Sequence, residues 1–223
     1  MKVIFLAYRQ WSIDVMPAIE RHPKVKEVIF CKTQEELLSL DFSSFDLLIS
    51  CGWSEELGTE ITSKILAIGV HCAELDRYSY GSPIQNQIID QINYTKHRIF
   101  PFTFDPNSPR AHTHTREYSH EVSLDLSGGM EEILKQMTST SIVLFNMFLD
   151  DYPKISWTKW PEEKIIRKKR IPSDSKLTMT ELSKMNTEQL YNLIRCLEFP
   201  YPNAYLEDEM GYLYFEKVRY KKK

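Results

Sequence analysis

Histidine is distributed unevenly along this chain, and its positions indicate where acid–base chemistry could take place. Five of the six histidines lie between residues 71 and 120, namely His71, His97, His112, His114 and His120. Because imidazole titrates near pH 7, a pocket lined by several of these side chains could both accept and donate protons. The alternative is that several of them are surface residues.

Two patterns in this stretch carry the remaining polar residues. His71-Cys-Ala-Glu74-Leu-Asp76 leaves the end of a predicted strand, and His112-Thr-His114-Thr-Arg116 alternates polar residues, which a strand would place on one face. Guanidinium groups bind phosphates and carboxylates in a fork of two hydrogen bonds. We therefore predict that the substrate is held by four residues of the stretch: Asp76, Arg77, Arg110 and Arg116.

A metal site is an alternative use of the same residues. Histidine and carboxylate side chains suit zinc, manganese or iron, and the ligands would be His71, His112 and His114 with Glu74. Familiar ligand spacings such as HExxH are missing from the sequence. We accordingly predict no metal.

The first hundred residues contain the elements that must position these side chains. Short β-branched or aromatic runs alternate with amphipathic segments, which is typical of a doubly wound, mainly parallel α/β sheet. Ligands of such sheets bind beyond the carboxyl ends of the strands, where Cys51-Gly52-Trp53-Ser54 and His71-Cys-Ala-Glu74 would lie. The predicted strands are Val3–Ala7, Val25–Cys31, Phe45–Cys51 and Ile65–His71.

The rest of the chain predicts further elements and a division into parts. We expect a helix near Ser12–Glu20, a helix with Pro83 in its first turn, strands over 96–104 and 117–126, and a long helix reaching Leu149. Residues 1–150 would form the catalytic domain and 151–176 a linker. Residues 177–223 would add a small α+β subdomain with two helices and a strand over Gly211–Val218.

Composition excludes several classes of protein. The chain is 42% hydrophobic and 26% charged, as in ordinary soluble proteins, and it contains no GxGxxG or GxxxxGK[ST] phosphate loop. Residues 1–150 carry 13 basic and 20 acidic side chains, a net charge of −7, which does not favour binding to nucleic acid. With neither a membrane-spanning run nor a secretory signal, and with four cysteines on apolar stretches, the protein is expected to be cytoplasmic with reduced thiols.

Two motifs resemble one known family. The first comprises Leu48-Ile-Ser-Cys-Gly-Trp-Ser54, Ile68-Gly-Val-His71 and Gly81-Ser-Pro-Ile-Gln85, and the second runs from Ile194-Arg-Cys-Leu197 to Pro200-Tyr-Pro-Asn-Ala-Tyr205. Both are similar to motifs of the formyltransferase family, which includes methionyl-tRNA formyltransferase and the sugar N-formyltransferases. The resemblance covers most of residues 1–218 and implies a Rossmann-like formyltransferase fold.

This resemblance implies transfer of a formyl group from N10-formyltetrahydrofolate to an amine. His71 takes the place of the family's histidine. Glu74, His112 and His114 would complete the catalytic group. The residues near the folate would be Gly52, Trp53 and Gly69. Two family identities differ. Gly69 replaces an asparagine, and the segment over 109–114 has histidines where the family has an aspartate.

The expected function is therefore an N-formyltransferase acting on a small amine, with a nucleotide-linked amino sugar as first choice and a homodimer as the expected assembly. A divergent enzyme with a rebuilt, histidine-rich and metal-binding site is one alternative. A relative that binds folate or a nucleotide sugar without turnover is the other. A tRNA substrate is not expected.

Overall fold

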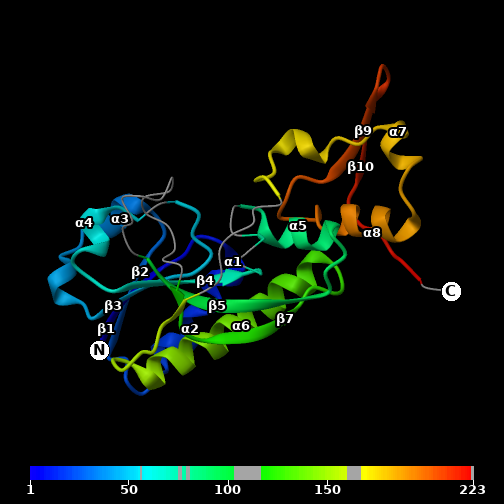
Figure 1. The fold of residues 1–223 in the computed structure, drawn as a ribbon. Helices are drawn as coiled ribbons and strands as arrows, with labels where there is room; N and C mark the ends of the chain where they lie inside the picture. Colours follow the sequence, from blue (N-terminus) through cyan, green and yellow to red (C-terminus); the bar gives the residue numbers. More distant parts are fainter. Residues whose placement is uncertain (56, 75–76, 79–80, 103–116, 160–166, 222–223) are drawn as a thin grey trace. The chain divides into compact units, whose positions relative to one another are not determined.

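The computed structural model of the chain describes residues 1–55, 57–74, 77–78, 81–102, 117–159 and 167–221 (Figure 1). Their contacts divide the chain into two compact units, each built from separate stretches. Unit 1 comprises Met1–His71, Lys96–Ser123 and Met137–Pro161, and unit 2 comprises Cys72–Thr95, Leu124–Gln136 and Glu162–Lys223. The domain boundaries expected from the sequence stay a prediction.

A six-stranded sheet with the strand order β2-β1-β3-β4-β5-β7 forms the centre of the fold. Its pairs β1–β2, β1–β3 and β3–β4 are parallel, which confirms the predicted doubly wound α/β class. The four predicted N-terminal strands are present within two residues of their expected ends. The strands are β1 (Lys2–Leu6), β2 (Glu27–Cys31), β3 (Leu47–Ser50), β4 (Ala67–Cys72), β5 (Tyr94–Phe102) and β7 (Glu121–Asp125).

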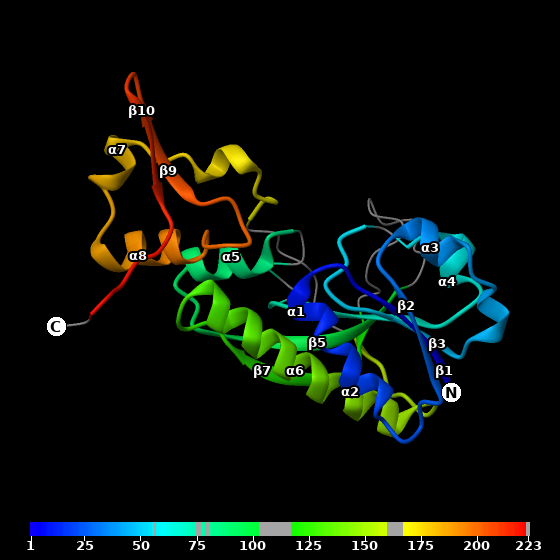
Figure 2. The same ribbon diagram turned by 180° about the vertical axis from the view of Figure 1, so that it is seen from behind.

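Helices cover both faces of the part of this sheet that lies in unit 1, as Figures 1 and 2 show. Helices α2 and α6 lie on one face, and α3 and α4 on the other. The predicted helix near Ser12–Glu20 is two helices, since Pro17 has no N–H group to continue the first and begins the second. The helices are α1 (Gln10–Ile13), α2 (Met16–Glu20), α3 (Gln34–Leu38), α4 (Thr59–Thr62), α5 (Pro83–Ile89), α6 (Met130–Asp151), α7 (Met179–Leu182) and α8 (Thr187–Arg195).

The hydrophobic core of unit 1 lies between the sheet and the second half of α6. Phe145 and Phe148 of that helix are fully buried and pack with Phe5 and Ile49 of the central strands. Burial of each such side chain contributes about 1.5–3 kcal/mol, so this one layer holds the strand order. Of the described helices, none is both long and apolar enough to cross a membrane.

Unit 2 contains α5, α7, α8 and a hairpin of β9 (Ala204–Asp208) and β10 (Gly211–Phe215). A buried cation organises it. The Arg195 guanidinium donates hydrogen bonds to the carbonyls of Leu126 (2.5 Å) and Gly128 (2.8 Å), the residues that precede α6. The fold is completed by the 3₁₀ turns Phe42–Ser44 and Pro172–Ser175 and by the short pair β6 (Glu117–Tyr118) and β8 (Thr158–Lys159).

All four cysteines are buried free thiols, as expected from the sequence. Burial raises the pKa of the Cys72 and Cys196 thiols to about 12, and that of Cys31 to about 11. At neutral pH these groups are therefore thiols and not reactive thiolates.

Candidate active site

His71 lies at the carboxyl end of β4, where the sequence predicted it. Ser50 of β3 is level with Leu6 of β1 and with Gly69 of β4, so His71 stands two residues beyond the last paired position. The ring is 9% exposed, its Nε2 atom is buried, and its centroid lies 6.5 Å from that of Phe100 in an edge-on arrangement. An imidazole is thus held at the sheet edge where ligands of parallel sheets bind.

Gly69 lies two residues before His71, and aromatic rings fill the space above it. A Cβ atom built at this position would stand 2.7 Å from Phe100 Cζ and 2.8 Å from Phe102 Cε2. Real Cβ atoms do not approach carbon atoms so closely, so the position excludes any side chain in this packing. The two rings pack against each other with centroids 4.8 Å apart.

The carboxyl ends of β1 and β3 form an aromatic and polar group beside β4. The Tyr8 and Trp53 rings meet edge-on at 5.4 Å, and the Tyr8 hydroxyl is hydrogen-bonded to Ser54 Oγ at 2.8 Å. Arg9 lies over the Tyr8 ring at 5.1 Å. The indole N–H of Trp53 is buried with no hydrogen-bond partner among the described residues, so it is a donor that a ligand could use.

Gly52 makes the turn that presents Trp53. Its φ of +65° is a left-handed conformation that favours glycine, and a Cβ atom here would lie 2.8 Å from Trp11 Cζ2. The conformation and the close approach of α1 together account for a glycine after β3. A direct role of Gly52 toward folate stays a prediction.

His97 is fully buried on β5 and packs against α6. Its Nδ1 is hydrogen-bonded at 2.8 Å to the Thr140 hydroxyl, which itself donates to the carbonyl of Met137 at 3.2 Å. Burial, with a smaller contribution from His71, lowers the pKa of His97 to about 3. His97 is therefore neutral near pH 7 and is no acid–base catalyst there.

We expect His97 to make the protein sensitive to acid. The unfolded chain protonates this ring near pH 6.5 while the folded chain does so only near pH 3, so its contribution to stability is complete above pH 6.5 and is lost as the pH falls. The free energy of unfolding should fall by about 1.4 kcal/mol per pH unit from this group. Urea titrations between about pH 5.5 and 4, below the unfolded pKa and above the folded one, should show this slope, and His97→Gln should remove this contribution. Equal slopes in both proteins would contradict the assignment.

His120 lies elsewhere in unit 1. Its Nε2 contacts Asp151 Oδ2 at 3.1 Å near the end of α6. The neighbouring Asp150 is bonded to His22 and Lys24, and Lys24 also receives a hydrogen bond from the N-terminal amine of Met1. This is the amino end of β1, opposite to the end where His71 lies. The three described histidines of the cluster thus occupy different places, and among them only His71 is at the carboxyl edge.

Gln87 of α5 holds the segment that follows His71. Its side chain is fully buried, and its Nε2 donates to the carbonyls of Cys72 and Pro83, each at 3.0 Å. Its Oε1 accepts from the Thr95 hydroxyl at 2.5 Å and from the backbone N–H of Glu74 at 3.4 Å. Glu74 is therefore positioned through its backbone by a glutamine in unit 2.

Replacing Gln87 by methionine should loosen this segment. The change keeps the length of the side chain but leaves buried donors and acceptors without partners, so we expect a loss of about 2 kcal/mol in the free energy of unfolding. Faster hydrogen exchange at the Glu74 amide should accompany it. Gln10→Met is the matched control, since Gln10 is exposed and bonds only to Asp14, and its effect should stay within about 0.5 kcal/mol. A loss no larger than that of the control would show that the network is not important for stability.

No model of a known protein family matches the chain, and neither does any curated protein. Solved structures do match. Methionyl-tRNA formyltransferase from Clostridium thermocellum superposes with a TM-score of 0.79 at 22% identity, over 99% of this chain and 94% of that one. A 4-N formyltransferase from Francisella tularensis gives 0.73 at 14% identity, over 99% and 98%. HypX from Aquifex aeolicus in complex with tetrahydrofolic acid gives 0.70 at 10% identity, over 93% of this chain and 36% of that one.

The chain has the formyltransferase fold. The resemblance stated from two sequence motifs is thereby confirmed at the level of fold. The expectation that Gly69 replaces the family's asparagine stays a prediction, and the packing of Phe100 and Phe102 leaves no room for a side chain at this position.

Several predicted site residues fall outside the described residues of this fold. These are Asp76, Arg110, His112, His114 and Arg116. Arg77 is described and exposed, with its backbone N–H bonded to the carbonyl of Glu74. Among described residues, no group of three or more His, Cys, Asp or Glu side chains is arranged to hold a metal ion.

Sequence reasoning singled out the segment that contains Ser54 but missed Tyr8 and Arg9. A signal was available, since Tyr8 and Arg9 directly follow the first strand of a sheet whose carboxyl ends bind ligands in proteins of this class. Only the ends of the third and fourth strands were singled out. The register places Leu6 at the end of β1 level with Ser50 at the end of β3 and with Gly69 of β4, which brings the end of β1 into the same group.

Proposed function

We propose that this protein is an N-formyltransferase that moves a formyl group from N10-formyltetrahydrofolate to the amine of a small metabolite, and that the acceptor is a nucleotide-linked amino sugar. The observation that carries the proposal is a formyltransferase fold over almost the whole chain, with His71 at the carboxyl end of β4. The solved neighbours with this fold include a 4-N formyltransferase and a protein in complex with tetrahydrofolic acid.

The reaction joins the amine nitrogen to the formyl carbon and breaks the bond from that carbon to N10. One proton leaves the amine and one is gained by the folate nitrogen, so the reaction is balanced without an oxidant or a metal. In the proposed mechanism His71 takes the amine proton and returns it to the leaving nitrogen. Phe100 packs edge-on against the imidazole and limits its rotation.

The residues at the carboxyl edge fit a folate. The rings of Tyr8 and Trp53 offer faces and edges for a flat heterocycle, and the buried Trp53 N–H is a donor without a partner among described residues. The side-chain amide that the family directs at the oxyanion is replaced by Gly69. Loss of one such donor typically costs about 10²–10³ in rate, so turnover should be slow.

Gly69 also favours a second candidate function. A protein that binds folate or a nucleotide sugar without turnover would need the fold but not the missing amide. The two candidates differ in one measurement, namely whether a formylated product appears.

The proposal also includes the cellular compartment and the oligomeric state of the protein. The buried free thiols support a reducing compartment, which we take to be the cytoplasm. Exposed aromatic side chains of the hairpin support a homodimer, since Tyr212 and Tyr214 are 61% and 56% exposed.

The test is a product assay with the full chain. N10-formyltetrahydrofolate is incubated with a panel of nucleotide-linked amino sugars, and mass spectrometry follows the addition of one formyl group. Formylation of one acceptor above the reaction without protein supports the proposal. Saturable binding of donor and acceptor without product would establish the non-catalytic alternative instead.

A further inference from the structure

Unit 2 contains a cavity that the proposed chemistry does not use. It has a volume of about 220 Å³ and lies between α5, the turn that starts at Pro172 and the segment after α8. Its walls are mainly apolar and include Pro172, Leu197 and Pro202. Pockets for drug-sized ligands run from about 300 to 1,000 Å³, so this cavity has room for one ring and not for a whole cofactor.

The wall from α5 contributes a polar edge. Gln85 lines the cavity, is 4% exposed, and forms no side-chain hydrogen bond to another described residue. An amide has a donor and an acceptor side by side, and a ligand in the cavity could use both. The complementary partner is a ring with an acceptor next to an N–H, as in uracil or thymine.

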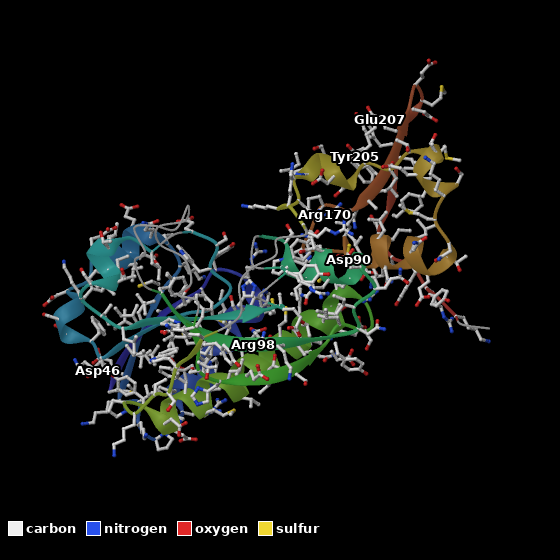
Figure 3. All side chains as sticks on the ribbon, in the orientation of Figure 1. Asp46, Asp90, Arg98, Arg170, Tyr205 and Glu207 are labelled. Carbon is white, nitrogen blue, oxygen red and sulfur yellow. The ribbon has the colours of Figure 1, made fainter. Side chains whose placement is uncertain are left out.

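Positive charge borders the same cavity. Arg170 lines it, and its backbone N–H donates to Ser82 Oγ at 3.1 Å, which fixes the residue beside α5 (Figure 3). The guanidinium donates to the carbonyl of Asp174 but pairs with no described carboxylate. By contrast, the nearby Arg167 is neutralised by Asp90, which also accepts from the Tyr78 hydroxyl.

Arg167, Lys168, Lys169 and Arg170 form a run of four basic residues whose environments differ. Lys168 and Lys169 are exposed and form no ion pair with the described residues, and Arg170 follows them at the cavity. A cation at the edge of a one-ring apolar cavity with an amide wall, preceded in the chain by two exposed lysines, is complementary to a base that carries phosphates.

We propose that this cavity binds the base of a pyrimidine nucleoside diphosphate, with the Gln85 amide on the base and Arg170 on the phosphates. The inference deepens the proposed function, because it rests on a nucleotide-linked acceptor and names the part of the chain that holds the nucleotide. It assigns a role to a basic segment that formyl transfer leaves unused.

Calorimetric titration of the full chain with uridine diphosphate and with uridine tests the proposal. Gln85→Leu should weaken both ligands by about tenfold to hundredfold, since it removes the amide and keeps the apolar wall. Arg170→Met should weaken uridine diphosphate by about tenfold, reduce its salt dependence and leave uridine unchanged. Lys184→Met, an exposed cation elsewhere in unit 2, is the control and should change neither ligand.

A wild-type measurement covers the case in which Gln85→Leu does not fold. Uridine diphosphate should slow hydrogen exchange in α5 and in residues 197–202. No binding by the wild type, or binding that neither protects these segments nor depends on Gln85, overturns the inference. The binding titration contains no folate, so it tests the cavity independently of formyl transfer. Binding of uridine diphosphate without formyl transfer in the product assay refutes only the proposed function. Formyl transfer to a nucleotide sugar that Gln85→Leu leaves unaffected refutes only the role of the cavity.

Discussion

His71→Ala is expected to reduce formyl transfer by about 10²–10⁴-fold, the usual contribution of a positioned acid–base group. His71 is the described histidine at the carboxyl edge of the sheet, while His97 is held neutral by burial and His120 lies at the opposite end. The assay is initial-rate formation of formylated product, with folding of the variant checked by circular dichroism.

Two comparisons make the His71 result specific. His120→Ala should leave the rate within about twofold, because its side-chain partners among the described residues, Ser119, Asp151 and the Phe148 ring, lie outside the proposed site. A titrating His71 should also appear as an ionisation in the pH dependence of kcat that is missing from any residual activity of His71→Ala. Undiminished transfer in a folded His71→Ala protein would refute the assigned role.

Gly69→Asn, which restores the family identity, should destabilise the protein and not improve it. The new Cβ atom would meet the rings of Phe100 and Phe102 at less than 3 Å. Overpacking typically costs about 1–3 kcal/mol, and a buried amide without partners adds a comparable penalty, so we expect a loss of about 4 kcal/mol in urea-induced unfolding.

An asparagine at position 69 should be tolerated only if a neighbouring aromatic ring is made smaller. Gly69→Asn combined with Phe102→Ala should lose less stability than the sum of the two single changes, since one removes the clash that the other creates. Gly58→Asn is the matched control: Gly58 is the N-cap of α4, and the three atoms nearest to a Cβ built there all belong to the movable Glu60 carboxylate. Its effect should stay within about 0.5 kcal/mol. A Gly69→Asn protein as stable as the wild type would show that the aromatic rings move aside easily.

Elements with local signals could be predicted from the sequence. The strands of unit 1 are short apolar runs between turns, and Pro83 marked the start of α5 correctly. The helix at Met179 was predicted from Thr178 and Glu181, whose side chains form the reciprocal capping box that the spacing indicates. In each case the determining residues lie within a few positions of one another.

Features that depend on distant partners could not be predicted. The sequence predicts the strand of β10 but not its hairpin partner β9, which begins at Ala204 inside the second of the two family motifs. The role of Gln87 has no local signal, since nothing in the neighbouring sequence shows that its amide meets Cys72, Pro83 and Thr95 in the folded chain. Gly69 was recognised as a departure from the family, but the reason for it lies on the next strand of the sheet.

The buried thiols provide a built-in reporter for these experiments. A thiol with a pKa of about 12 is almost wholly protonated at neutral pH and is shielded from reagents, so Cys72 and Cys196 should be alkylated only when unit 2 opens. Cys72 is also the residue whose carbonyl Gln87 holds beside His71. The rate at which this thiol is labelled therefore measures how often the segment next to the histidine exposes itself, and it needs no added probe.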